Sequence, residues 1–344
     1  MHKLKSKFRQ VLLSAVVAGA ACLLVGCGSG KTVESTDNKK LQIVTTIFPE
    51  YDWVKEILGN QAENAELTLL LGNGTDMHSF QPTMEDILNV STCDVFIYVG
   101  GESDSWVADA LESSGNPDRK VINLMEVMGD QVKEEEVVEG MQADEEGEEA
   151  TEFSQDSDEH AHNEDAPEYD EHVWLSLRNA SLFCDTIADV LAEADPEHAK
   201  LYQQNADDYE EKLAALDQEY QTTVGQSKSK TLLFADRFPF RYMTDDYDLT
   251  YYAAFTGCSA ETDASFETIT FLAGKLDELK LPAVLTIENS DQKVAKAVIS
   301  NTDTKDQKIL TLNSMQSVTT QEVKEGTTYL SIMEGNLQIL KEAL

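Results

Sequence analysis

Histidines and carboxylates gather in one stretch of this sequence. Residues 133–171 include 18 acidic residues and one basic residue, and three histidines lie in or beside them: His160, His162 and His172. Imidazole nitrogens suit divalent transition metals, and acidic side chains raise the local concentration of cations. The pattern therefore predicts metal capture. The alternative is an acidic segment with no binding role, because such segments are usually just solvated and disordered.

Other candidate ligands follow predicted strands. His78 comes after an apolar run in the first half of the chain, and Asp236, Glu261 and Glu288 follow three such runs in the second half. Ligands of open parallel sheets bind beyond the carboxyl ends of the strands. Two histidines and one or two carboxylates meeting there would make a four-coordinate zinc site. Each carboxylate taken alone also fits a helix cap or a solvated charge.

Short apolar runs alternate with amphipathic helical stretches in both halves of the chain. Strands are predicted at 41–47, 67–71, 94–99 and 120–124, and again at 231–234, 250–255, 283–287 and 309–312. Strands separated by helices pair in parallel through right-handed crossovers. The predicted fold class is therefore α/β, with two Rossmann-like βα lobes, parallel sheets and a metal cleft between the lobes.

One long helix is predicted to join the lobes. Asp195 and Pro196 indicate its start as N-cap and first helical residue, and apolar residues at spacings of four and three continue it to about residue 224. Its length is roughly 40 Å at 1.5 Å per residue. This helix, 196–224, would separate an N-terminal lobe (41–195, with the acidic loop 133–171) from a C-terminal lobe (225–344). Within the first lobe, Thr83 and the residues after it predict a capping box that opens a helix.

The N-terminus indicates export and a lipid anchor. Residues 1–27 combine four basic residues with an apolar stretch that is short for a membrane span. The stretch ends at Leu24-Val25-Gly26-Cys27, which looks like a bacterial lipobox, so we expect Cys27 to be lipidated. Residues 28–40 would then be a tether, and the protein would be extracytoplasmic and anchored to the cell membrane.

Several functional classes are disfavoured. The formal net charge of −38 is opposite to that of a nucleic-acid-binding surface. The segment 28–32 resembles the end of a phosphate-binding loop but lacks its first glycine and a preceding strand. A metallohydrolase would need a pattern such as HExxH, which is absent, so we expect no enzyme. Cys93, Cys184 and Cys258 are widely spaced, and we expect buried small apolar residues there.

The mature sequence resembles the cluster A-I solute-binding lipoproteins of zinc and manganese ABC transporters, and looks like the zinc branch. The matching segments are 43–49, 74–83 and 170–175. The resemblance implies that His78 and His172 are metal ligands and that His160 and His162 lie in a metal-gathering loop. It also implies Zn²⁺ as the transported ligand, with Mn²⁺ as the alternative, and a membrane permease with its ATPase as partners. We expect the protein to be a monomer.

The second lobe departs from the family pattern. Ala235 stands where the family has its third ligand, and residues 312–314 offer no late aspartate. The remaining ligands must then come from Asp236, Glu261, Glu288, the loop histidines or water, and Glu261 is favoured because it lies on a compact turn. A relative that binds no metal, an adhesin and a lipid-anchored metallohydrolase remain alternatives. Residues 133–170 are expected to be a mobile collector, with His172 as the fixed ligand at its end.

Overall fold

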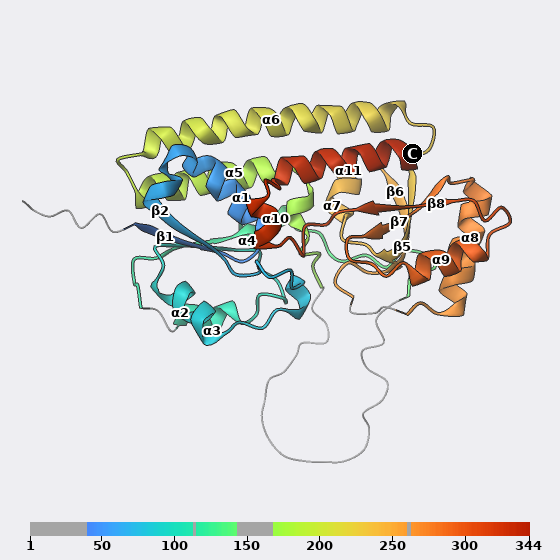
Figure 1. The fold of residues 1–344 in the computed structure, drawn as a ribbon, viewed down its shortest axis with the longest axis horizontal. Helices are drawn as coiled ribbons and strands as arrows, with labels where there is room; N and C mark the ends of the chain where they lie inside the picture. The colour runs from blue at the N-terminus through green and yellow to red at the C-terminus, as the bar shows by residue number, and fades with distance from the viewer. Residues whose placement is uncertain (1–39, 113–114, 143–167, 260–262) are drawn as a thin grey trace, which may run out of the picture. The chain divides into compact units, whose positions relative to one another are not determined.

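Two parallel sheets form the centres of the two lobes in the computed structural model, which describes residues 40–112, 115–142, 168–259 and 263–344 (Figure 1). Within these residues the first sheet has the strand order β2-β1-β3-β4 and the second the order β6-β5-β7-β8. The strands are β1 (Leu41–Thr45), β2 (Ala65–Leu69), β3 (Val95–Tyr98), β4 (Lys120–Asn123), β5 (Thr231–Arg237), β6 (Thr250–Phe255), β7 (Ala283–Ile287) and β8 (Lys308–Leu312). All pairings are parallel, as predicted.

Helices cover both sheets and connect successive strands. They are α1 (Phe48–Leu58), α2 (Met84–Thr92), α3 (Val107–Glu112), α4 (Leu124–Met128), α5 (Leu177–Ala194), α6 (Ala199–Gln226), α7 (Arg241–Asp246), α8 (Phe266–Leu279), α9 (Lys293–Ser300), α10 (Thr320–Lys324) and α11 (Tyr329–Ala343). Short 3₁₀ turns are η1 (Gly59–Asn64), η2 (Met77–Ser79), η3 (Gly129–Gln131) and η4 (Val173–Leu175). The capping box predicted at Thr83 opens α2. None of the described helices combines the length and apolar composition that crossing a bilayer demands.

The central strands are buried on both faces, which is why they read as continuous apolar runs. Val95, Phe96 and Ile97 of β3 are all fully buried. Strand β5 is longer than predicted, because a register shift between Phe234 and Arg237 lets it continue past the apolar run. The added residues bring Arg237 to the carboxyl end of the second sheet.

The long helix begins later than its sequence signals indicate. It runs from Ala199 to Gln226, and residues 195–198 form a turn after α5. The Asp195 carboxylate accepts hydrogen bonds from His198 Nδ1 and Tyr202 Oη, both at 2.7 Å. The predicted start at Pro196 was therefore wrong by three residues, because Asp195 binds side chains instead of capping the first helical amides.

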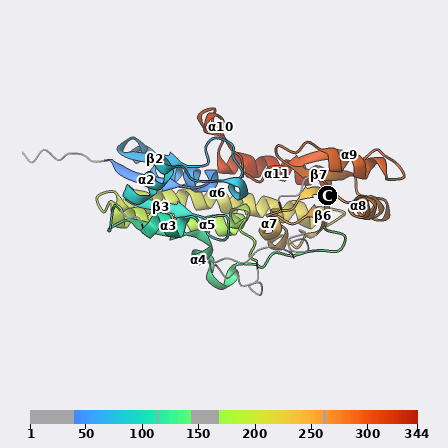
Figure 2. The same cartoon turned by 90° about the horizontal axis from the view of Figure 1, so that it is seen from below.

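Two helices tie the lobes together. The long helix α6 packs against α1 and α5 of the first lobe and against α11, which follows the last strand of the second (Figures 1 and 2). Tyr220 of α6 donates a hydrogen bond to the Met333 carbonyl of α11 at 2.6 Å. Helix α11 also contacts α1. The connection between lobes therefore involves a second helix besides the predicted strut.

The described ends of the acidic segment are ordered, and they lie against the second lobe. Gln142 forms a bridge with Phe255 of β6, and the Glu136 carboxylate pairs with Arg241. The amide of Glu135 donates to the Glu168 carbonyl at 2.8 Å, which brings the two ends of the segment together. The structure therefore places these ends against the second lobe, and the mobile collector stays a prediction. Residues 143–167, which include His160 and His162, lie outside the described residues, as does Cys27.

Candidate metal centre

His78 is presented from the loop that follows β2. It lies in η2, where its amide donates to the Asp76 carboxylate at 3.1 Å. Its Nδ1 is 2.8 Å from Ser103 Oγ, in the loop after β3. Because Nδ1 already has a hydrogen-bond partner, Nε2 is the nitrogen left for a ligand.

His172 is fixed from the opposite side of the site. It is fully buried and directly precedes η4. The Asp170 carboxylate accepts from His172 Nδ1 at 2.9 Å and from the His172 amide at 2.8 Å. The hydroxyl of Tyr242, in α7 of the second lobe, donates to the Asp170 carbonyl at 2.9 Å. This carboxylate–histidine arrangement is the one that orients a metal-binding imidazole and leaves Nε2 free.

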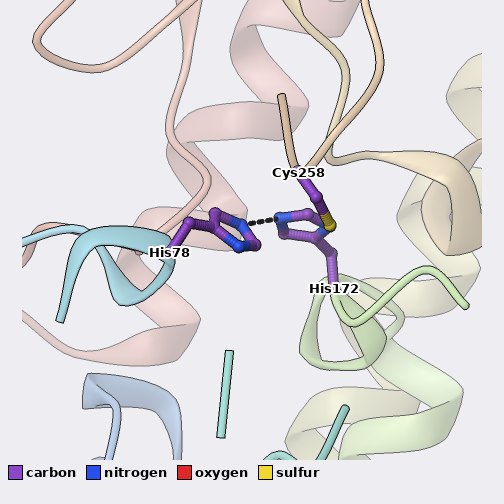
Figure 3. A group of neighbouring side chains, drawn as sticks. All are labelled: His78, His172 and Cys258. Atoms are coloured by element: carbon purple, nitrogen blue, oxygen red, sulfur yellow. Dashed lines mark hydrogen bonds between the residues drawn. The ribbon is translucent and has the colours of Figure 1, made fainter. Parts of the chain in front are cut away.

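The two imidazoles meet at their Nε2 atoms, which lie 3.1 Å apart (Figure 3). The thiol of Cys258, from the loop after β6, completes a group whose potential ligand atoms all lie within 4.8 Å of one another. Among the described residues, these three side chains form a group that could hold a metal ion. Its members come from both lobes: His78 follows β2 and Cys258 follows β6, as the position rule for open parallel sheets predicts, whereas His172 directly precedes η4.

Negative charge surrounds the three donors. Glu171 Oε2 is buried without a hydrogen-bond partner and lies 3.7 Å from His78 Nδ1. Burial lowers the pKa of His78 well below its usual range, which keeps the imidazole neutral and its lone pair available. Burial raises the pKa of the Cys258 thiol, and the carboxylate of Glu135 raises it further. Burial raises the pKa of the Glu171 carboxyl group, and a divalent cation at this point would favour its charged form.

A polar bridge between the lobes lies beside the donors. Arg237, at the end of β5, pairs with Asp76 of the first lobe at 2.6 Å. The side-chain amide nitrogen of Gln316, oriented by its partners, donates to Asp76, and its side-chain oxygen lies 2.9 Å from His172 Nε2. Burial opposes ionisation of Asp76, but the Arg237 guanidinium outweighs it and lowers the pKa of the carboxyl group. The bridge therefore holds the His78 loop against the second lobe.

Two of the carboxylates predicted as ligands accept hydrogen bonds from backbone amides. Asp236 accepts from the amides of Arg237 at 2.9 Å and Ile287 at 3.3 Å. Glu288 accepts from the backbone amide of Ser314 at 2.7 Å, from the Ser314 hydroxyl at 2.8 Å and from the backbone amide of Gln316 at 3.2 Å. Neither belongs to the histidine and cysteine group. Ala235 is buried in the core of the second lobe, and Glu261 lies outside the described residues.

Cys258 is a candidate donor that the sequence analysis missed. The prediction of a buried apolar role fits Cys93 and Cys184, which are buried, but Cys258 is partly exposed and faces the imidazoles. One signal was present in the sequence, because Cys258 follows a predicted strand by three residues, in the segment that already pointed to Glu261.

Asp170→Ala is expected to weaken zinc binding by about 10- to 100-fold, because His172 loses the carboxylate that orients it. Zinc titration of the metal-free protein measures the change. Asp195→Ala is the matched control, since it removes the same kind of carboxylate–histidine pair, with His198, outside the site. Equal affinities of the two variants would contradict the orienting role of Asp170.

Gly257→Ala is also expected to weaken zinc binding, because an added Cβ would lie 3.0 Å from both His172 Cε1 and the Phe238 carbonyl oxygen. The loop would have to move away from His172 and take Cys258 with it. Gly274→Ala is the control, since its added Cβ meets nothing within 4 Å. Zinc titration of both variants should show a loss of affinity for the first alone, and an unchanged Gly257→Ala would contradict the close packing.

Two βα lobes that together bring His78, His172 and Cys258 into one group define a two-lobed binding protein. The chain belongs to the ZnuA family, described as zinc-uptake complex component A, periplasmic, whose sequence model matches residues 43–343. This assignment agrees with the resemblance inferred from the sequence.

Relatives of known name align with this chain over most of its length. It is 30% identical to the zinc-binding lipoprotein AdcA of Streptococcus pneumoniae serotype 4, over 94% of this chain and 58% of AdcA, so it spans a little over half the length of that protein. It is 28% identical to the high-affinity zinc uptake system protein ZnuA of Bacillus subtilis, over 96% of each chain. The crystal structure of the Zn(II)-bound ZnuA-like domain of S. pneumoniae AdcA matches with a TM-score of 0.66 and 27% identity, over 88% of this chain and 98% of that one.

Proposed function

We propose that this protein is the extracytoplasmic solute-binding component of a zinc ABC transporter. It captures Zn²⁺ between its two lobes and delivers it to a membrane permease driven by an ATPase. The observation that carries the proposal is the His78–His172 pair, whose Nε2 atoms face each other at 3.1 Å while their Nδ1 atoms are held by Ser103 and Asp170. The zinc-binding names of the relatives AdcA and ZnuA support it.

The donor types favour zinc over manganese. Imidazole suits zinc, whereas manganese is better matched by carboxylate, carbonyl and water oxygens. Asp236 and Glu288 are engaged by backbone amides. Glu261 stays a proposed oxygen donor for the same metal.

The two helices that join the lobes restrict how the metal ion is released. Because α6 and α11 both span the junction, wide hinge motion is disfavoured, and release is proposed to proceed through loop movement or contact with the permease. The proposed role includes no catalytic step. We further propose that the protein is a monomer anchored through Cys27, and that His160 and His162 gather metal near the site.

Metal analysis of the purified full-length chain tests the proposal. The expected result is one zinc ion per chain, retained in competition with an excess of Mn²⁺, and poor growth in chelated medium of a strain that lacks the protein. A chain that retains manganese in preference to zinc would favour the manganese-type alternative. A chain that retains neither metal would overturn the proposed function.

A further inference from the structure

The turn that carries Cys258 is held in place by contacts from three parts of the chain. The Cys258 amide donates to Glu135 Oε1 at 3.1 Å, from the ordered beginning of the acidic segment. Gly257 lies close against the ring of His172. Arg237 donates to the Ser259 carbonyl at 3.5 Å, and Ser259 is itself buried. Cys258 therefore has a defined position beside the two imidazoles, unlike a thiol on an unsupported surface loop.

The spacing of the donors matches a small tetrahedral centre. With zinc–nitrogen bonds of about 2.0–2.1 Å and a zinc–sulfur bond of about 2.3 Å, tetrahedral geometry places ligand atoms roughly 3.3–3.6 Å apart. The two Nε2 atoms are 3.1 Å apart, and all three donors lie within 4.8 Å of one another. Small shifts of these side chains on metal binding would close the remaining difference.

We propose that the Cys258 thiolate is the second-lobe ligand of the transported metal, in a centre made of His78, His172 and Cys258. The inference rests on the proposed function and deepens it. On binding, the sulfur–metal bond forms as the S–H bond breaks, the proton leaves to solvent, and no atom changes oxidation state. An oxygen donor, water included, completes the tetrahedron.

This ligand set has a consequence for selectivity. A thiolate is a soft ligand that favours zinc and disfavours manganese, which prefers oxygen. Cys258 is partly exposed, although its raised pKa keeps it mostly in the slowly reacting thiol form at neutral pH. A bound metal would shield the sulfur, whereas Cys93 and Cys184 are buried with or without it.

Cobalt spectroscopy of the full-length chain tests the assignment. The Co²⁺ complexes of the wild type and of the control Cys93→Ser are expected to show a sulfur-to-cobalt charge-transfer band in the near ultraviolet, and Cys258→Ser is expected to lack it. Zinc affinity of Cys258→Ser should fall by more than ~10-fold, since loss of a ligand should exceed the effect of losing the group that orients one. Thermal unfolding without metal checks that the variant is folded.

Alkylation of the wild type supplies a test that needs no variant. Above neutral pH, where part of the thiol ionises, iodoacetamide should modify Cys258 slowly in the metal-free protein, and zinc should protect it, as peptide mapping by mass spectrometry would show. A cobalt complex without the band, or a band that persists in Cys258→Ser, would overturn the cysteine assignment. If zinc binding still requires His78 in that case, the proposed function stands. If the wild type binds neither zinc nor cobalt, the proposed function itself fails.

Discussion

Replacing His78 and His172 together by alanine is expected to abolish tight zinc binding. The two Nε2 atoms face each other at 3.1 Å, so the double variant removes both nitrogens of the centre. Each single variant should lower zinc affinity by at least ~100-fold, because residues that only orient a ligand already change affinity by about 10- to 100-fold. Calorimetric titration of zinc into chelator-stripped protein measures both effects.

The two single variants differ in their cost to the fold. The His78 side chain is 11% exposed, whereas that of His172 is fully buried, and truncation of His172 removes the imidazole from the Asp170 carboxylate, which keeps the His172 amide as a donor. His78→Ala is therefore the cleaner test. His198→Ala is the control, since His198 lies in the turn before α6 and pairs with Asp195. Undiminished zinc binding by the double variant would show that the centre lies elsewhere.

The sequence predicted the fold well because the apolar runs and the helical spacing of apolar residues in this chain are local and regular. Strands β6 and β7 begin and end at the predicted residues. The differences arise where side chains make contacts that periodicity does not encode. At Asp195, the side chain binds His198 and Tyr202 instead of capping the helix.

The candidate site was only partly predictable, and the reason lies in the second lobe. His78 and His172 belong to sequence segments typical of the family. The role of each carboxylate depends instead on which backbone amides the fold brings within hydrogen-bond distance of it. Glu288 reaches the amides of Ser314 and Gln316, more than 20 residues away in the sequence, so its engagement cannot be read from neighbouring residues.

Cys258 was missed for a related physical reason. A widely spaced cysteine in an odd set predicts a buried apolar residue. Its position beside His172 depends on Glu135, which lies 123 residues earlier in the chain. Glu135 belongs to the stretch that was expected to be mobile, and the structure places this end of it against the cysteine turn. Part of the acidic segment therefore builds the site, instead of only leading metal toward it.

Trp174→Ala is expected to cause the largest loss of stability among single substitutions near the site. Trp174 is fully buried; its Nε1 donates to the Ser314 carbonyl in the second lobe at 2.8 Å, and its own carbonyl accepts from Tyr329 Oη at 2.7 Å. Truncation of a buried tryptophan costs about 3–5 kcal/mol. Urea unfolding of the metal-free protein measures this cost.

Trp174→Phe separates the contribution of ring packing from that of the hydrogen bond to the Ser314 carbonyl. Phenylalanine retains most of the apolar packing but leaves the Ser314 carbonyl without its donor, so we expect a smaller loss of about 1–3 kcal/mol. The ring of Trp174 also lies 5.2 Å from that of His172, so its removal frees the imidazole to move. Zinc affinity should therefore fall in Trp174→Ala and change little in Trp174→Phe. If both variants lose equal stability, the hydrogen bond between the lobes, and not the packing of the ring, is what holds the His172 segment in place.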